Sequence, residues 1–183
     1  MKKSILVLSV ILLVSSINLE AQKCYLGVGS GVNNSSGMLG VFFETPINSN
    51  FSAKAAAGVG GWGTKAGIAV KYYKAFPSSM SFGIGYSTAS GLSDFEYEVE
   101  LENGDKSKEK FNLKRAHMID FTMGKSWGEK VRFNLEFGYS LKISGGSYEH
   151  LDSNEELSDD AKKVFDMLSP GGLIIGIGLS FRL

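Results

Sequence analysis

The sequence lacks the features that three common classes of protein require. It has a single cysteine, Cys24, among 183 residues, so the chain cannot build a disulfide framework. Lys plus Arg and Asp plus Glu both number 19, which leaves no net positive charge to attract nucleic acid. After the N-terminal segment the longest apolar run is roughly eight residues, and a membrane-spanning helix needs about 20. We therefore expect neither a disulfide-stapled domain nor a nucleic-acid-binding or helical membrane protein.

Residues 1–21 are organised as a secretory signal peptide. The apolar core of this segment, residues 5–14, is too short for a membrane anchor, and no stop-transfer pattern follows it. We predict export through the Sec pathway, cleavage near Ala21, and one domain over residues 22–183. The positive start, the apolar core and the cleavage site are, in order, Lys2 with Lys3, residues 5–14, and Leu19-Glu20-Ala21.

Cys24 lies close to that cleavage site, where a cysteine can carry a lipid. Lys23 precedes it, at a position where a lipoprotein signal needs a small residue. We therefore interpret Cys24 as an ordinary strand residue.

What the chain has in abundance is two-residue alternation. In residues 172–183, GLIIGIGLSFRL, large apolar side chains occupy the odd positions, and the even positions are mostly small. This period is that of a β-strand, and the same pattern recurs seven more times upstream. The sequence thus predicts an all-β fold: an eight-stranded antiparallel up-and-down transmembrane β-barrel, with a short helix in its last outer loop. The predicted strands cover residues 24–32, 37–44, 51–61, 65–74, a segment opening at Met80, 111–124, 130–143 and 172–183.

Alternation alone does not say which face points outward, because a soluble lipocalin-like barrel also alternates, with its apolar side chains inside. Three features favour the membrane form. The second face is rich in Gly, Ser and Ala with scattered charges, which suits the narrow interior of an eight-stranded barrel. The apolar face is nearly uninterrupted in four strands. Both long connections leave from the same end, as in outer-membrane barrels.

The same alternation assigns side chains to the lumen and to the lipid-facing wall. We expect a polar lumen, too full to be an open pore, crossed by ion pairs among Lys71, Asp120, Arg132, Glu136 and Arg182. Aromatic side chains on the other face are candidates for the girdles that mark the two membrane interfaces. These candidates are Phe51, Tyr72, Phe82, Tyr86, Phe137, Tyr139 and Phe181.

The long connection around residues 90–110 continues to alternate, which predicts a hairpin that extends two strands beyond the membrane. A three-residue loop, Glu102-Asn103-Gly104, would place glycine in the left-handed position. A two-residue Asn-Gly loop would oppose like charges instead. Because the favoured register slips by one residue against the barrel strands, we expect a bulge near Ser90-Gly91. That register opposes Glu100 with Lys106, Glu98 with Lys108, Glu96 with Lys110, and Phe95 with Phe111.

The second long connection, residues 145–171, predicts a short helix. Ser158 can cap it, Asp159 and Asp160 suit its first turn, and Pro170-Gly171 ends it. One stripe of the helix is apolar, and we expect this stripe to lie on the barrel mouth as a lid rather than to bind a partner. The stripe contains Ala161, Val164, Phe165 and Leu168. The acidic residues of the connection match no metal-binding spacing, so we interpret them as a solvated face: Glu149, Asp152, Glu155, Glu156, Asp159 and Asp160.

Together these features resemble the small eight-stranded outer-membrane barrels of Gram-negative bacteria, the group of outer-membrane protein X and the membrane domain of outer-membrane protein A. The resemblance rests on the signal peptide, the eight two-faced strands and the terminal GLSFRL. It implies contact with outer-membrane lipids and lipopolysaccharide, and insertion by the barrel-assembly machinery, which recognises the C-terminal strand. Leu179, Phe181 and Leu183 would form that signal, with Leu183 in place of the usual final aromatic residue.

We expect a non-enzymatic outer-membrane protein that is structural or mediates interactions. Two alternatives stay open: a lipid-modifying enzyme such as a lipid A deacylase, and an adhesive protein acting through loops 90–110 and 145–171. Deacylases of this group carry a His-x-Ser arrangement on one strand, but Ile119 stands two residues after His117. His150 has no serine at matching spacing either. We therefore predict no catalytic residue, cofactor or metal site.

Overall fold

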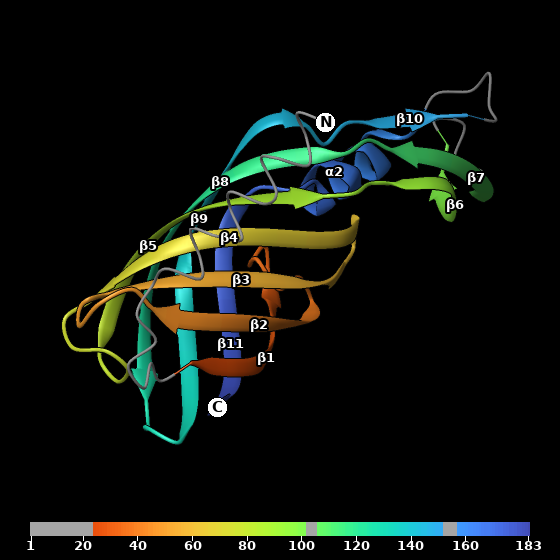
Figure 1. The fold of residues 1–183 in the computed structure, drawn as a ribbon. Helices are drawn as coiled ribbons and strands as arrows, with labels where there is room; N and C mark the ends of the chain where they lie inside the picture. The colour runs from red at the N-terminus through yellow and green to blue at the C-terminus, as the bar shows by residue number, and fades with distance from the viewer. Residues whose placement is uncertain (1–23, 102–105, 152–156) are drawn as a thin grey trace, which may run out of the picture.

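The computed structural model describes residues 24–101, 106–151 and 157–183, and most of them form one closed β-barrel (Figure 1). Eight antiparallel strands follow one another around the ring, and β11 pairs with β1 to close it. They are β1 (Tyr25–Val32), β2 (Leu39–Pro46), β3 (Phe51–Gly60), β4 (Gly63–Tyr73), β5 (Met80–Ala89), β8 (Ala116–Trp127), β9 (Val131–Gly145) and β11 (Gly172–Arg182). The predicted all-β class, the eight-stranded antiparallel barrel and the short helix are confirmed.

One predicted strand is wrong. Residues 111–124 do not form one strand but belong to two, β7 (Lys106–Leu113) and β8. Leu113 is buried under a small sheet outside the barrel, whereas Ala116 is buried on the barrel itself. The buried side therefore changes from odd to even positions within three residues, and a regular strand cannot make that change because its side chains alternate strictly.

The register of the barrel is strongly staggered. From Gly29 on β1, register partners lead through β2, β3, β4 and β5 to Ala116 on β8. In the other direction they lead through β11 and β9 to Ser126, ten residues further along the same strand β8. Stagger and strand tilt are linked in a closed barrel, where strands typically lie about 35–45° from the axis. Each strand thus crosses the wall obliquely.

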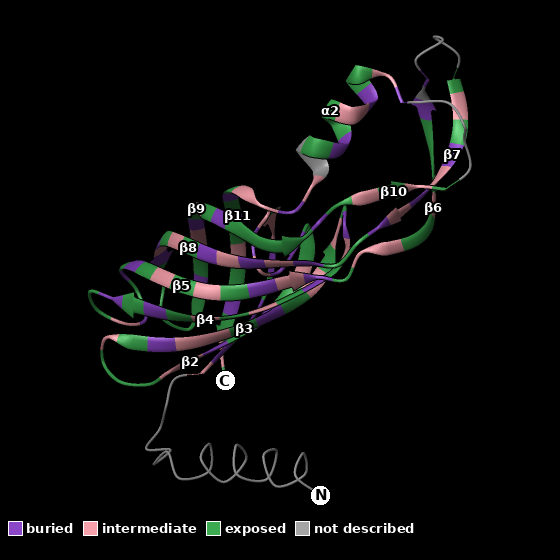
Figure 2. Ribbon diagram, turned by 90° about the horizontal axis from the view of Figure 1, so that it is seen from above, coloured by how far each residue is buried: buried purple, intermediate pink, exposed green. Residues whose placement is uncertain are grey.

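Side chains along the barrel strands alternate between a buried inner row and an exposed outer row (Figure 2). On β5, Ser81 and Ser87 are buried, while the apolar side chains between them are 42–56% exposed. Glycine makes room for the inner row, since a Cβ on Gly27 would lie only 2.6 Å from the ring of Phe42, which is buried in the lumen. Large apolar residues therefore face out, which is the orientation expected from the sequence.

The two ends of the barrel differ in their connections. At the end where β1 begins and β11 finishes, residues 47–50, 74–79 and 128–130 join neighbouring strands as short turns. At the other end, which we call the mouth, β6 (Leu92–Glu100) and β7 separate β5 from β8. There too, β10 (Tyr148–His150) and α2 (Asp159–Leu168) separate β9 from β11. Both long connections leave from the mouth, as expected.

Strands β6, β7 and β10 form a separate three-stranded sheet, the outer sheet, which projects beyond the mouth (Figures 1 and 2). The predicted hairpin register is confirmed: Glu96, Glu98 and Glu100 oppose Lys110, Lys108 and Lys106, and Phe95 opposes Phe111. The predicted loop Glu102-Asn103-Gly104 lies outside the described residues.

The predicted bulge is present in this hairpin. It lies between Leu92 and Phe95, just beyond the Ser90-Gly91 pair near which it was expected. Leu92 keeps its pairing with Leu113, so the slip occurs beyond it, at Asp94, which has a positive φ of 52°. Aspartate is one of the few residues with a side chain that enters this conformation readily.

The helix α2 begins as predicted, and its packing corrects the expected lid. The Ser158 hydroxyl accepts a hydrogen bond from the Ala161 amide at 3.2 Å, and two aspartates occupy the first turn. Phe165 is 3% exposed and packs against Phe111 and Tyr148 of the outer sheet, with ring centroids 4.6 Å apart in each case. Phe165 of the apolar stripe therefore packs on the outer sheet rather than on the barrel mouth, because aromatic rings on β7 and β10 are its close partners.

Several predictions concern residues that the structure leaves undescribed. They are the signal peptide over residues 1–21 and the acidic residues Asp152, Glu155 and Glu156. Among the described residues, no helix is both long enough and apolar enough to span a membrane.

Candidate functional site

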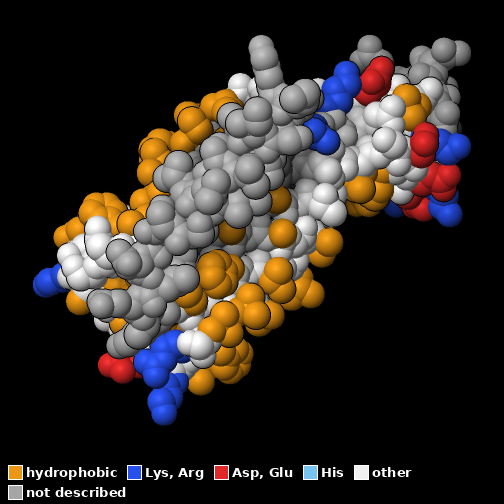
Figure 3. Space-filling view, in the orientation of Figure 1, with side chains coloured by type: hydrophobic (Ala, Val, Ile, Leu, Met, Phe, Trp, Pro, Cys, Tyr) orange, Lys and Arg blue, Asp and Glu red, His pale blue; other side chains and the backbone are white. Residues whose placement is uncertain are grey.

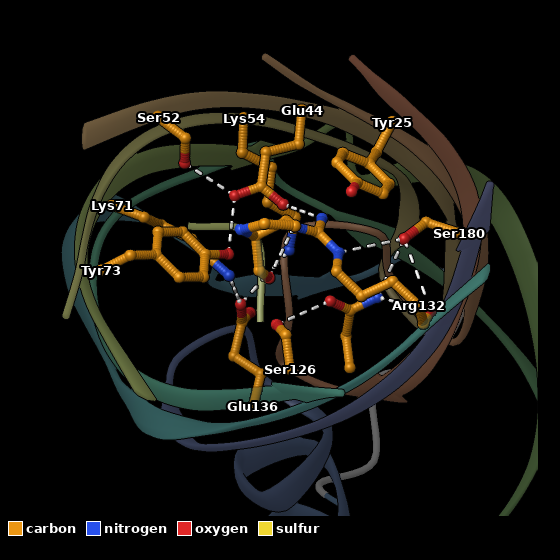
Figure 4. A network of polar contacts seen from close by, with 12 residues as sticks. Tyr25, Glu44, Ser52, Lys54, Lys71, Tyr73, Ser126, Arg132, Glu136 and Ser180 are labelled. Atoms are coloured by element: carbon orange, nitrogen blue, oxygen red, sulfur yellow. Dashed lines mark hydrogen bonds and ion pairs between the residues drawn. The ribbon is translucent and has the colours of Figure 1, made fainter. Parts of the chain in front are cut away.

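The barrel interior is built around a buried ion pair between Arg132 of β9 and Glu44 of β2 (Figure 4). Arg132 is fully buried, and its guanidinium also lies 4.1 Å from the ring centroid of Tyr25. The Glu44 carboxylate accepts hydrogen bonds from the Ser52 hydroxyl at 2.6 Å and the Tyr73 hydroxyl at 2.7 Å. Every partner comes from a different strand, so this cluster ties β1, β2, β3, β4 and β9 together across the lumen.

A second ionic cluster lies beside the first. The Glu136 carboxylate of β9 lies 2.5 Å from Lys71 Nζ and 3.3 Å from Lys54 Nζ, both measured to the same oxygen. Lys54 also lies over the ring of Phe42, 5.1 Å from its centroid. Two cations thus share one carboxylate, and an aromatic face gives one of them an additional favourable contact.

The structure brings together three of the five residues expected to form lumen ion pairs, Lys71, Arg132 and Glu136. Asp120 is buried but accepts a hydrogen bond from the Ser140 hydroxyl at 2.5 Å. Arg182 lies at the end of β11, opposite Tyr25, and makes no ion pair with a described residue.

The sequence-based set of ion pairs omitted Glu44, the carboxylate that Arg132 requires. A signal for it was available: Leu39, Val41 and Phe43 alternate outward on the same strand, which puts position 44 on the inner face. Its place at the end of a strand, next to a cluster of turn residues, hid that signal. Lys54 carried the same kind of signal, because it lies between Ala53 and Ala55 of the outward row on β3, which puts position 54 on the inner face.

The space left around these side chains is small. Two cavities border the network, with volumes of about 20 and 10 Å³. A water molecule needs about 10–15 Å³ measured in this way, so each cavity holds roughly one. Asn34, whose side-chain oxygen is buried without a partner among the described residues, lines the larger cavity and would accept a hydrogen bond from such a water.

The outer wall contrasts with this interior on all eight strands. Where Figure 3 shows the barrel wall, many hydrophobic side chains lie on it, while charged ones gather toward the two ends of the molecule. All seven candidate girdle aromatics are on this surface, each 41–57% exposed. Phe51, Tyr72 and Phe82 are register partners on neighbouring strands near the turn end. The expected assembly residues Leu179, Phe181 and Leu183 are exposed as well.

The two histidines lie in different surroundings. On the barrel wall, His117 Nδ1 lies 2.5 Å from the Tyr86 hydroxyl, with the two rings stacked. In the outer sheet, His150 Nε2 lies 2.9 Å from a Glu109 carboxylate oxygen. Hydrogen bonds from Ser107 and His150 hold the pKa of Glu109 below its usual value. Neither histidine is hydrogen-bonded to a serine hydroxyl among the described residues.

The outer sheet and the barrel mouth share one apolar core. Phe111, Leu113, Val99 and Phe165 belong to one buried cluster with Trp62, Ala116 and Met118. This continuity fastens the outer sheet to the barrel, although the two sheets share no strand.

The comparisons with known proteins leave the fold and this geometry as the basis for function. No protein-family model matches the chain, and a search of curated proteins finds no similar sequence. Within the described residues, no three side chains of His, Cys, Asp or Glu are grouped so that they could hold a metal ion.

Proposed function

We propose that the protein is an integral outer-membrane β-barrel, non-enzymatic, in contact with lipid around its whole circumference. The observation that supports this most is the contrast between the apolar outer wall and the ionic interior. Monomeric soluble proteins rarely expose apolar patches larger than a few hundred Å². Here every barrel strand presents large apolar side chains outward, and bilayer hydrocarbon is the surrounding that removes them from water.

The soluble alternative, a lipocalin-like barrel, fits this arrangement poorly. Such a barrel keeps apolar side chains inside to hold a ligand. The lumen here contains Arg132, Glu44, Lys71 and Glu136 in close contact, and the cavities beside them are too small for an organic molecule. In this proposal the turn end faces the periplasm, and the mouth with the outer sheet faces the exterior and the lipopolysaccharide.

The proposal extends to the route by which the barrel reaches the membrane. Residues 1–21 would direct Sec export and be removed near Ala21, and the barrel-assembly machinery would insert the chain through β11. A folded barrel migrates differently on a gel before and after boiling, and we expect this heat-modifiability together with recovery in the outer-membrane fraction. Purified protein that stays dissolved and folded without detergent would contradict the proposal.

A second candidate function is attachment through the outer sheet. β6 pairs only with β7 among the described strands, and the single bridge beyond it joins Leu101 to Leu157, so over Leu92–Glu100 its other edge could pair with an extended segment of a partner. Deletion of residues 95–110 should then abolish surface attachment while the barrel keeps its heat-modifiability. Attachment that survives this deletion would leave only the structural role.

A further inference from the structure

The barrel mouth contains a cleft that the ionic interior and the apolar wall do not account for. Its volume is about 240 Å³. The turn between β1 and β2 forms one side, the turn between β3 and β4 another, and Pro170 after α2 a third. Mouths of β-barrels are common places for small ligands.

Hydrogen bonds tie the walls of this cleft to one another. Asn33, held in a left-handed conformation with φ of 54°, donates from its side-chain amide to Gly171 O at 2.6 Å and to Leu173 O at 3.3 Å. The Met38 amide donates to Val59 O at 2.7 Å. The cleft is therefore largely preformed and need not be assembled by a ligand, which lowers the entropic cost of binding.

Most of the lining is apolar, and one cation interrupts it. Val32, Met38, Trp62 and Pro170 are the larger apolar residues, with glycines between them. Lys65 also lines the cleft, although its side chain is only 7% exposed.

The Lys65 ammonium is incompletely matched by the protein. Its Nζ donates to Asn33 O at 2.6 Å, the single hydrogen bond it makes within the described part of the chain. An ammonium group has three donors, and no described carboxylate lies within ion-pair distance of this one. A buried cation in an apolar setting is costly unless an anion accompanies it, so the site favours a negatively charged ligand.

We propose that this cleft binds a small amphipathic anion, a medium-chain alkyl carboxylate, with its carboxylate beside Lys65. Its alkyl chain lies against Val32, Met38 and Trp62. The carboxylate supplies the acceptors that the lysine lacks, and the apolar walls remove the chain from water. This ligand site goes beyond the proposed membrane role, since it depends only on the geometry of the mouth.

The two tryptophans of the chain make the site directly measurable. Trp62 is in the cleft wall, whereas Trp127 is at the turn end of the barrel, so Trp127→Phe leaves Trp62 as the only reporter. Octanoate brominated at its terminal carbon should quench Trp62 fluorescence saturably in protein refolded in a zwitterionic detergent. Unlabelled octanoate should compete, whereas octanol and octyltrimethylammonium should compete poorly.

The charge of Lys65 is tested by matched variants in the same background. Lys65→Gln should weaken binding by about tenfold or more, the order expected for one hydrogen bond to a charged group. Lys65→Arg should retain binding, and Lys74→Gln, which removes an exposed lysine at the turn end, should leave it unchanged. Heat-modifiability of each variant shows that the barrel has folded.

Three outcomes would overturn the proposal. One is equal affinity in the Lys65→Gln and parent proteins, which would mean that the charge is not recognised. Another is equal competition by octanol, which would mean that any alkyl chain suffices. The third is quenching of Trp62 that does not saturate and equals the quenching of Trp127 in a Trp62→Phe protein. Trp127 lies away from the cleft, so its quenching measures only the partition of brominated octanoate into the micelle.

Discussion

At the scale of single residues, Arg132 shows how the barrel interior is held together. A guanidinium with no exposed surface requires a partner for its charge, and Glu44 supplies it from the far side of the lumen. Such a pair is weak evidence for net stability, because both charges lose their hydration. Removal of one partner strongly destabilises the fold, since the remaining charge is then buried without compensation.

We therefore predict that Glu44→Ala lowers the free energy of unfolding by about 3–5 kcal/mol. Urea unfolding in detergent or lipid measures this loss, with Glu129→Ala, at an exposed turn, as the control. The double variant Glu44→Leu with Arg132→Met should recover much of the loss, because it leaves no unpaired charge. A Glu44→Ala protein as stable as the control would contradict this account of the lumen.

A second residue-scale prediction concerns Glu109 of the outer sheet. Because its pKa in the folded protein is lowered by hydrogen bonds from Ser107 and His150, its contribution to stability is complete above the unfolded value of about 4.3. That contribution is lost as the pH falls through the lower folded value. Hydrogen exchange, corrected for its intrinsic pH dependence, should show the outer sheet opening in acid before β11 does. Glu109→Gln should remove this difference, and an unchanged acid response in that variant would count against it.

His117 provides a third residue-scale prediction. Its ring is hydrogen-bonded to Tyr86, and no hydroxyl-bearing residue stands two positions on. We expect the acyl chains of lipid A to be the same in cells with the protein, without it, and with His117→Ala. A difference in lipid A that the substitution abolishes would favour the enzymatic alternative.

At the scale of elements, strands and hairpin register followed well from the sequence. The Glu–Lys pairs of the outer hairpin were predicted because only one loop length opposes unlike charges along both strands. The split between β7 and β8 was not predicted, although Arg115 interrupts the row of Leu113 and His117. The change of buried side there depends on the outer sheet, whose third strand, β10, comes from a distant loop.

The strand β11 provides an element-scale test of the membrane. Ile177 is 52% exposed and lies at the middle of this strand, between Ser30 and Leu135 in register. In a bilayer, Ile177→Lys should cost about 2–4 kcal/mol of folding free energy. Val131→Lys, near the turn end, should cost about 0–1 kcal/mol. Refolding into lipid vesicles against denaturant measures both, and equal, negligible costs would indicate that the wall faces water.

At the scale of the whole molecule, the stagger of the barrel decides which inner side chains meet. Lys54, Lys71 and Glu136 come from β3, β4 and β9 and fill the lumen together. We predict that planar-bilayer recordings of the purified protein show no large, stable conductance, because the cavities beside this network hold about one water each. Long-lived open steps would show that the network opens in the membrane.

The sequence by itself determined all the barrel strands but one, and the apolar and polar face of each, because a two-residue period is a local property of the chain. It also determined the outer hairpin, whose paired residues are close in sequence. Only the tertiary structure decided that Arg132 meets Glu44, that α2 packs on the outer sheet, and that Lys65 lines a cleft at the mouth. These contacts join segments far apart in the chain, and they depend on the closure and stagger of the barrel, which no local pattern specifies.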